Sequence, residues 1–377
     1  MSPAPPVAEP AADRLVIEFA ESPSAIAAAL TQWRALAANA SAIPCTASSN
    51  WTEAWLRHYG DCVQPRVAIG RRGGKAIAFW LVPRSRHRCH GPVPLRTAHL
   101  GTAGEPERES VFVEHNRPFV ADGLGEVDEA AFVEAVWNRL GDDPVDRIDA
   151  DGLPAEIADP LLAALATDDR STLEVERRAS RWMRFTREEH GCDLMAMLRR
   201  KTRSNYRRAA KRYSAVETTW QTGPEASANF DILIRLHQVR WERVGEPGSF
   251  SGTRLRAFLG DLLNQRKAAV AVTTDQGEPF GAAYLVSDAG RAVCLVVGFG
   301  DTARFESPGL VSLVPIMGEA CSRGFDGFEF LAGDSLYKRM LTNESCELVW
   351  IKQSQPTYRS RLTAHLVRWK RRLRPAT

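Results

Sequence analysis

The stretch that decides the fold is Ala268–Phe299, AAVAVTTDQGEPFGAAYLVSDAGRAVCLVVGF. Turn-forming residues divide it at two points, Asp275-Gln276-Gly277 and Ala289-Gly290. Short apolar runs separated by such turns are typical of antiparallel strands joined by hairpins. The pattern therefore predicts three consecutive strands, at 268–274, 281–286 and 292–299.

A helix and a further strand are expected directly after these three strands. Ser307-Pro308 is a typical helix start, and the residues after it predict a helix over 309–321. The apolar run 327–331 predicts the next strand. The start of a helix then lies beside the end of a strand, which is an arrangement suited to phosphate groups.

The remaining chain alternates short strands with amphipathic helices and shows no repeat of solenoid length. A long basic helix is expected over 194–213, and a second helix over 227–243. The order of elements predicts an α+β protein in which meander strands, a helix and further strands occur twice. The Pro/Ala-rich residues 1–13 are expected to be a disordered tail.

Charge is concentrated in two segments, although the formal net charge of the 377 residues is only +3. Residues 199–212 hold eight Lys or Arg and residues 359–374 hold seven, and neither segment contains an acid. Like-charge clusters are commonly solvated, and they also attract anions. An anionic ligand is expected at the basic helix 199–212. The second segment is expected to pack its apolar side on the N-terminal part of the protein, with peripheral membrane contact through 359–374 as the alternative.

The composition excludes several classes of protein. Hydrophobic residues make up 44% and charged residues 25%, as in ordinary globular proteins. The seven cysteines are widely spaced without a CxxC motif, so neither a disulfide framework nor a structural zinc site is expected. No histidine–carboxylate spacing suggests a metal site either. The start of the chain lacks the pattern of a secretory signal, which favours a cytoplasmic location.

An ordered series of short motifs carries a resemblance to a known family. The series begins with Lys201-Thr-Arg203-Ser-Asn205-Tyr-Arg207-Arg208 and Leu236-His237-Gln238-Val-Arg240-Trp241, and it continues with Gly298-Phe299, Ser307-Pro308-Gly309 and Phe328-Glu-Phe330-Leu-Ala-Gly333-Asp334 before Tyr337-Lys338-Arg339. This series resembles the bacterial acyltransferases of the GNAT superfamily of the BioF2-like and CelD-like type, which are relatives of the FemAB aminoacyl transferases.

The resemblance implies two tandem GNAT-like lobes, each a mostly antiparallel sheet flanked by helices. The N-terminal lobe would span 14–178 on the acceptor side, and the C-terminal lobe would span 179–355 on the acyl-donor side. The basic helix 356–377 would follow them. The implied cosubstrate is acetyl-CoA or another acyl-CoA.

The resemblance also implies roles for individual residues. Donor binding falls to Phe299 and to the start of the helix after it, where Ser307 and the backbone amides of Gly309, Leu310 and Val311 would hold phosphates. Asp334 would take the proton of the incoming ammonium. Tyr337 would protonate the leaving thiolate or donate to the oxyanion, and Lys338 would stabilise the oxyanion or hold an acidic substrate. The expected substrate contacts are Arg203, Asn205, Arg207, His237, Arg240 and Trp241.

The predicted activity is N-acyl transfer from an acyl thioester to an amine of a small molecule or of an envelope or polysaccharide precursor. Two alternatives remain open at this point. One is FemAB-like transfer from aminoacyl-tRNA, and the donor could also be carried by a carrier protein. The other is an accessory protein of exopolysaccharide synthesis that keeps the fold without the chemistry.

Overall fold

The computed structural model describes residues 15–40, 43–87, 93–111, 113–121, 125–166, 171–243 and 245–373. The expected tail at 1–13 lies outside these residues. In chain order the first half contains β1 (Val16–Ala20), α1 (Pro23–Ala37), α2 (Ser49–Tyr59), β2 (Val67–Arg72), β3 (Lys75–Leu81), β4 (Arg84–His87), β5 (Leu95–Leu100), β6 (Phe119–Val120), α3 (Gly125–Gly141), β7 (Arg147–Pro154), α4 (Ala155–Leu165) and β8 (Thr172–Arg184).

The second half is richer in helices that flank a single sheet. It contains α5 (Arg187–His190), α6 (Leu194–Met197), α7 (Arg200–Ala210), β9 (Val216–Thr222), α8 (Ser227–Arg243), α9 (Thr253–Asn264), β10 (Ala268–Asp275), β11 (Glu278–Asp288), β12 (Arg291–Phe299), α10 (Pro308–Ser322), β13 (Gly327–Ala332), α11 (Leu336–Leu341), β14 (Glu344–Ser354) and α12 (Tyr358–Leu373). The three hairpin strands, the helix after them and the next strand are all present as predicted.

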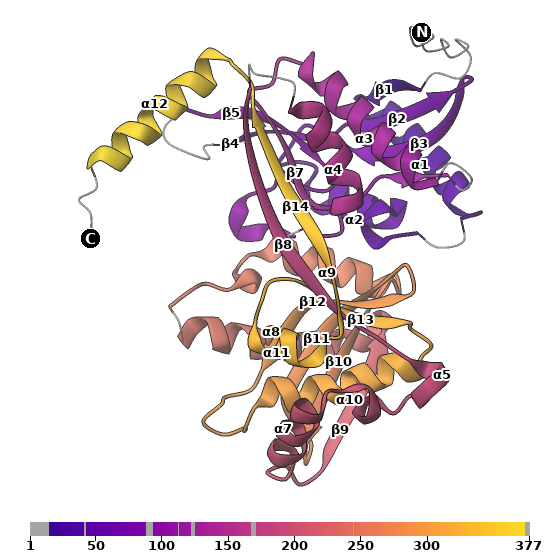
Figure 1. Cartoon of the computed structure of the whole chain (residues 1–377), viewed down its shortest axis with the longest axis vertical. Coiled ribbons are helices and arrows are strands. Elements are labelled where there is room, and N and C mark those ends of the chain that lie inside the picture. Colours follow the sequence, from indigo (N-terminus) through magenta and orange to yellow (C-terminus); the bar gives the residue numbers. More distant parts are fainter. Residues whose placement is uncertain are drawn as a thin grey trace, which may run out of the picture.

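One continuous sheet runs through both lobes (Figure 1). Among the described residues its strand order is β4-β5-β7-β14-β8-β13-β12-β11-β10-β9. The long strands β8 and β14 pair along their length, and β14 also pairs with β7 of the N-terminal lobe. The predicted lobe boundary at 178/179 therefore falls inside β8. The α+β fold class is confirmed.

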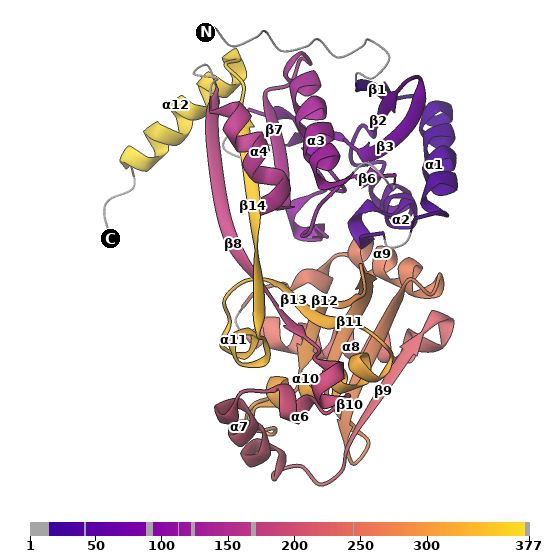
Figure 2. The same cartoon turned by 45° about the vertical axis from the view of Figure 1, so that its right-hand side comes forward.

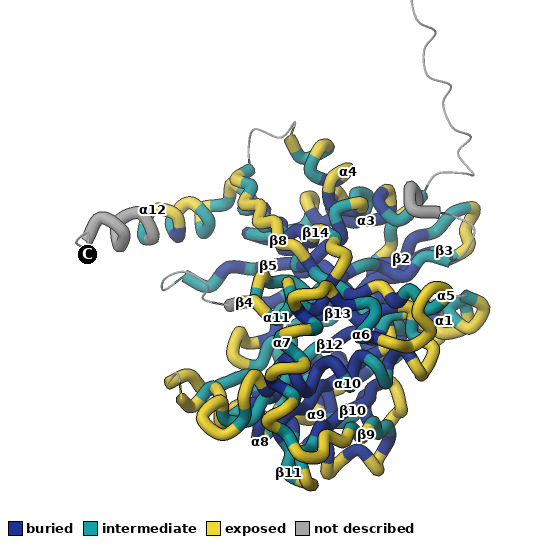
Figure 3. The backbone as a smooth tube through the Cα atoms, turned by 60° about the horizontal axis from the view of Figure 1, so that its bottom comes forward, coloured by how far each residue is buried: buried dark blue, intermediate teal, exposed yellow. Residues whose placement is uncertain are grey.

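Each lobe contains one parallel strand pair in an otherwise antiparallel sheet. These pairs are β5 with β7 and β12 with β13. A smaller sheet, β1-β2-β3-β6, packs with α1 and α2 at the edge of the N-terminal lobe (Figure 2). The central strands and α10 are the most deeply buried parts of the C-terminal lobe (Figure 3).

The prediction of one basic helix over 194–213 is wrong in one respect, because this segment forms two helices, α6 and α7. Leu198 and Arg199 have extended backbone angles and separate α6 from α7. Burial of Leu198 in the core around α10 favours this break. Arg203 then donates to the carbonyls of Met195 and Ala196, the last turn of α6.

The C-terminal basic helix is present as α12 and projects away from the sheet (Figure 1). No helix among the described residues combines the length and the apolar character that crossing a bilayer requires.

Candidate active site

A cavity opens where the parallel strands β12 and β13 diverge. The two strands pair only from Arg291 to Val293, opposite Gly327 to Glu329. Beyond this point β12 follows β11 to Phe299, whereas β13 turns toward β8 with a shift of register between Glu329 and Ala332. Leu331 lies at this shift with a left-handed backbone (φ 64°), which is strained for a non-glycine residue.

The cavity has a volume of about 270 Å³, and both lobes contribute to its wall. From the C-terminal lobe come the apolar residues of the diverging strands, together with α8, α9 and α11. The N-terminal lobe closes the opposite side with Trp51, Ser110, Val111 and Glu114. A largely apolar wall with a few polar groups is typical of a small-molecule site.

His237 of α8 is the best-defined polar group in this wall. Its side chain is 7% exposed, and Nδ1 lies 3.0 Å from the carbonyl oxygen of Val297 on β12. Because a carbonyl only accepts, Nδ1 carries the proton and Nε2 keeps its lone pair. Nε2 is buried without a hydrogen-bond partner in the described structure. Burial lowers the pKa of His237, so the ring is neutral at pH 7.

Close packing of α8 on β12 holds His237 in place. A Cβ atom on Gly298 would lie 2.8 Å from the backbone nitrogen of His237 and 2.9 Å from the carbonyl oxygen of Leu233. Only glycine at this strand position lets the helix approach so closely. Phe250 adds an edge-to-face contact with the imidazole, with 5.1 Å between ring centroids.

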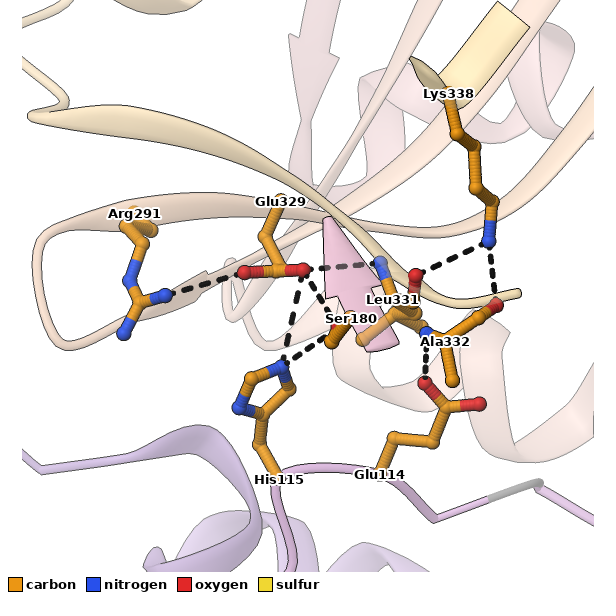
Figure 4. Close-up of polar contacts among 8 residues, drawn as sticks. All are labelled: Glu114, His115, Ser180, Arg291, Glu329, Leu331, Ala332 and Lys338. Carbon is orange, nitrogen blue, oxygen red and sulfur yellow. Dashed lines mark hydrogen bonds and ion pairs between the residues drawn. The ribbon is translucent and has the colours of Figure 1, made fainter. Parts of the chain in front are cut away.

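Lys338 of α11 lies across the strained end of β13 (Figure 4). Its Nζ donates to the carbonyls of Leu331, at 3.1 Å, and Ala332, at 2.6 Å. Burial lowers the pKa of Lys338, and the nearby carboxylate of Glu114 opposes this shift. The ammonium is thus fixed at the cavity wall by two backbone oxygens.

Glu114 comes from the N-terminal lobe and reaches the same strand end. Its Oε2 accepts from the backbone amide of Ala332 at 2.5 Å. Burial raises the pKa of Glu114, while that amide and the charge of Lys338 oppose the rise. Glu114 therefore links the two lobes at the cavity.

A second buried acid, Glu329, organises the polar contacts behind the cavity (Figure 4). Its Oε1 accepts from Ser180 Oγ at 2.8 Å and from the amide of Leu331 at 3.2 Å, and its Oε2 accepts from Arg291 at 3.1 Å. His115 of the N-terminal lobe lies 3.8 Å from Oε1. Burial alone would raise the pKa of Glu329, but these partners lower it below the usual value.

This cluster does not suit a metal ion. The ligand atoms of His115, Glu329 and Cys346 lie within 4.8 Å of one another. However, both oxygens of Glu329 already accept hydrogen bonds, and the guanidinium of Arg291 supplies the positive charge. The donor set is therefore an internal hydrogen-bond network.

Several predicted site residues line the cavity together. These are His237, Arg240, Trp241, Tyr337 and Lys338. Burial raises the pKa of the Tyr337 hydroxyl, so it stays protonated at neutral pH. Phe299 packs edge-to-face on the ring of Tyr337, with 6.2 Å between centroids.

Asp334 lies outside the cavity wall. Its exposed carboxylate accepts from Arg339 at 2.6 Å and from Arg181 at 3.1 Å. The hydrogen bond from Arg339 is the main reason that the pKa of Asp334 lies below its usual value. A carboxylate held in this way is a weak proton acceptor.

The predicted phosphate-binding residues lie at the start of α10. Ser307 has a left-handed backbone there, and its carbonyl accepts from the amides of Leu310, at 2.9 Å, and Val311, at 3.1 Å. These two amides are engaged within the helix. Gly309 stays within van der Waals reach of Phe299, so this helix start adjoins the end of β12.

Arg203, Asn205 and Arg207 lie on α7, away from the cavity wall. Thr202 joins this helix to α11 by donating to the carbonyl of Met340, at 3.0 Å. Just past the helix, Tyr213 donates to the carbonyl of Glu306 in the loop before α10. The basic helix thus adjoins the predicted phosphate-binding end of α10.

Sequence reasoning missed Glu114 and Glu329. Glu114 lies in an irregular segment without a motif, and nothing local indicates that it reaches the other lobe. Glu329 lies between Phe328 and Phe330 in an otherwise apolar strand. An acid at such a position indicates a buried and partnered carboxylate, and this signal could have identified Glu329.

Comparison with known proteins agrees with this geometry. Residues 200–339 match the family described as acetyltransferase (GNAT) domain. The crystal structure of FemX has a TM-score of 0.57 at 12% identity, and the match covers 89% of this chain and 98% of that one. A conserved protein of unknown function from Bacteroides thetaiotaomicron has a TM-score of 0.53 at 12% identity, covering 90% of this chain and 100% of that one.

No curated protein sequence matches the chain. The two solved structures share its fold, and the family match covers the part of the cavity wall that the C-terminal lobe supplies. Residues 200–339 therefore carry a GNAT acetyltransferase domain, and the chain as a whole has a fold similar to that of FemX.

Proposed function

We propose that the protein transfers an acyl group from a CoA thioester to an amine in the cavity between β12 and β13. The observation that carries this proposal is the neutral His237, whose Nε2 is unpartnered at the cavity wall. An amine attacks a thioester only when it is neutral, and an imidazole with a free lone pair can accept its proton. His237 takes the base role that the motif series suggested for Asp334.

The other polar groups support the remaining steps. Lys338 would stabilise the oxyanion of the tetrahedral intermediate, and the protonated Tyr337 would donate to the leaving thiolate. The attack forms the C–N bond and the collapse of the intermediate breaks the C–S bond. Glu114 would keep the backbone around Ala332 in place and balance the charge of Lys338.

Assignment of the donor to the C-terminal lobe rests on a difference between the two parallel strand pairs. In the N-terminal lobe, Asn116 Nδ2 donates to the carbonyls of Leu100, at 2.7 Å, and Asp151, at 3.1 Å, and so bridges β5 and β7 where their pairing ends. The equivalent ends of β12 and β13 border the cavity. The N-terminal lobe would then supply the acceptor side through Trp51, Val111 and Glu114.

The test is a transfer assay that follows release of the CoA thiol with a panel of amines. His237→Gln is expected to lower kcat/KM by about 10²-fold, the low end for a positioned acid or base, and to leave donor binding intact. The matched control is His58→Gln, because His58 faces Asp261 at the surface. Wild-type rates for His237→Gln would contradict the assignment of the base.

A polyanionic donor such as aminoacyl-tRNA is the second candidate, and α7 is the observation that favours it. Arg200, Lys201, Arg207 and Arg208 are exposed and form no ion pair with an acid within the part of the chain that the structure describes. Binding of RNA should weaken steeply with salt, and the double variant Arg207→Glu/Arg208→Glu should reduce it. Arg359→Glu/Arg361→Glu on α12 is the matched control. RNA binding that is absent at low salt would exclude this donor.

A further inference from the structure

Two cysteines meet where the last turn of α10 contacts the link between α5 and α6. Cys192 is exposed in the link between α5 and α6, and Cys321 is buried in the last turn of α10. The Cys321 thiol donates to the Cys192 sulfur, and the two Sγ atoms are 3.0 Å apart. Bond formation would need the sulfurs to close by only about 1 Å, since a disulfide measures about 2.0 Å.

The surroundings hold both thiols where they are. Arg187 at the start of α5 donates to Asp326 at 2.5 Å, which fastens this segment beyond the end of α10. Leu194 and Leu198 pack into the same core cluster as Cys321. Figure 2 shows α6 beside α10. The sulfur contact therefore follows from the packing of two anchored elements.

We infer that Cys192 and Cys321 are a modification site. Exchange with a low-molecular-weight disulfide such as oxidised glutathione forms a reversible disulfide between the two cysteines. The Cys192 thiolate attacks the glutathione disulfide, which releases one glutathione thiol and leaves a mixed disulfide. Cys321 then loses its proton and displaces the second glutathione thiol. The two cysteine sulfurs are oxidised, and one glutathione disulfide is reduced to two thiols.

The difference in exposure sets the order of these steps. Burial raises the pKa of Cys321 to about 12, so this thiol reacts slowly with an external disulfide. Cys192 meets the solvent and reacts first. Contact with Cys192 then makes the second step intramolecular, which compensates for the weak acidity of Cys321.

The cross-link would join positions 129 residues apart and enclose most of the C-terminal sheet. Closing so long a loop restricts the unfolded chain, and the oxidised protein should be the more stable form. It would also fix the segment that leads into α7 to the body of α10. This inference does not depend on the proposed transfer reaction.

The test is peptide mapping of the intact protein after exposure to oxidised glutathione. Trypsin places Cys192 in peptide 188–199 and Cys321 in peptide 305–323, each with a single cysteine. After alkylation of free thiols, the two peptides are expected to be joined and to separate on reduction. Recovery of both as individual alkylated or glutathionylated peptides would overturn the inference.

Thermal denaturation supplies a second readout. Oxidation should raise the Tm of the wild-type protein by several degrees, and reductant should reverse the rise. Cys192→Ser should abolish the rise, whereas Cys62→Ser, a matched change at a cysteine far from this pair, should retain it. A rise of equal size in Cys192→Ser would also overturn the inference.

Discussion

At the scale of single residues, the chemistry of the cavity depends on which nitrogen of His237 carries the proton. The Val297 carbonyl fixes the proton on Nδ1, and burial keeps the ring neutral. Both effects leave Nε2 ready to accept a proton from an amine. The free energy of protonating His237 is therefore linked both to activity and to the free energy of unfolding.

The pH dependence of kcat/KM follows from this. Because the pKa of His237 lies below the ordinary value of about 6.5, activity should be lost only as the pH falls below that value. The sign for stability is the same, since the neutral ring favours the folded state and this contribution declines as the pH falls through the unfolded value. In His237→Gln the acid limb of the profile should disappear. An unchanged acid limb would assign it to another group.

Lys338 and Asp334 form a natural pair of variants. Lys338→Ala removes the ammonium bound to Leu331 and Ala332, so kcat should fall by about 10²-fold. Asp334→Asn changes an exposed carboxylate that contacts Arg339 and Arg181, so kcat should stay within about twofold, as for surface changes away from the site. Steady-state kinetics measure kcat for both variants. A large loss of kcat in Asp334→Asn with little loss in Lys338→Ala would return the base role to Asp334.

The motif series predicted Tyr337, Lys338 and His237 as site residues, and all three line one cavity. The position of Asp334 could be predicted only in part, because its partner Arg339 lies five positions away but its second partner, Arg181 on β8, lies 153 positions away. Glu114 was beyond prediction for the same reason, since its partner is a backbone amide of the other lobe.

At the scale of elements, the approach of α8 to β12 shapes the cavity. Gly298→Ala places a methyl group against the backbone of α8, so it should lower the free energy of unfolding by about 1–3 kcal/mol and displace His237. Gly318→Ala in α10 is the matched control, because its Cβ meets no atom within 4 Å and alanine favours a helix. Denaturant unfolding measures both. Equal stability of the two variants would show that α8 can move without cost.

Element prediction succeeded where the hydrophobic pattern was strong and failed where it was weak. The hairpin strands of 268–299 and helix α8 are as predicted. Strand β8 was missed, because Leu173–Arg184 is rich in charged residues and much of it is exposed. The break between α6 and α7 was missed because helical spacing continues across it, whereas burial of Leu198 decides the local backbone.

At the scale of the whole molecule, Glu329 ties the lobes together through Ser180 and His115. Glu329→Gln removes the buried carboxylate charge that pairs with Arg291. The free energy of unfolding should fall by roughly 3–5 kcal/mol, the usual cost of breaking a buried pair. Glu344→Gln, an exposed acid on β14, is the control and should change little. Calorimetry compares the two proteins. A Glu329→Gln protein as stable as wild type would show that the charge of Glu329 does not stabilise the fold.

The long-range topology could not be predicted from local pattern. β14 comes from the end of the chain and enters the N-terminal lobe beside β7, so the division into 14–178 and 179–355 does not follow the sheet. Such pairing depends on which edge a strand finds in three dimensions. The cavity at the lobe junction is a consequence of this topology.

The central claim is that the cavity where β12 and β13 diverge binds an acyl-CoA. A thermal-shift titration with acetyl-CoA, a long-chain acyl-CoA and free CoA tests it directly. At a ligand concentration of about 100 times the dissociation constant, binding adds about 2.7 kcal/mol to the free energy of unfolding, which raises the Tm by several degrees. Val296→Phe should fill the cavity and remove the shift, while Val175→Phe, at an exposed position of β8, should keep it. The predicted result is a rise in Tm with a CoA thioester in the wild-type protein and no rise in Val296→Phe. No rise with any of the three ligands, or a rise in Val296→Phe equal to that of the wild type, would contradict the account.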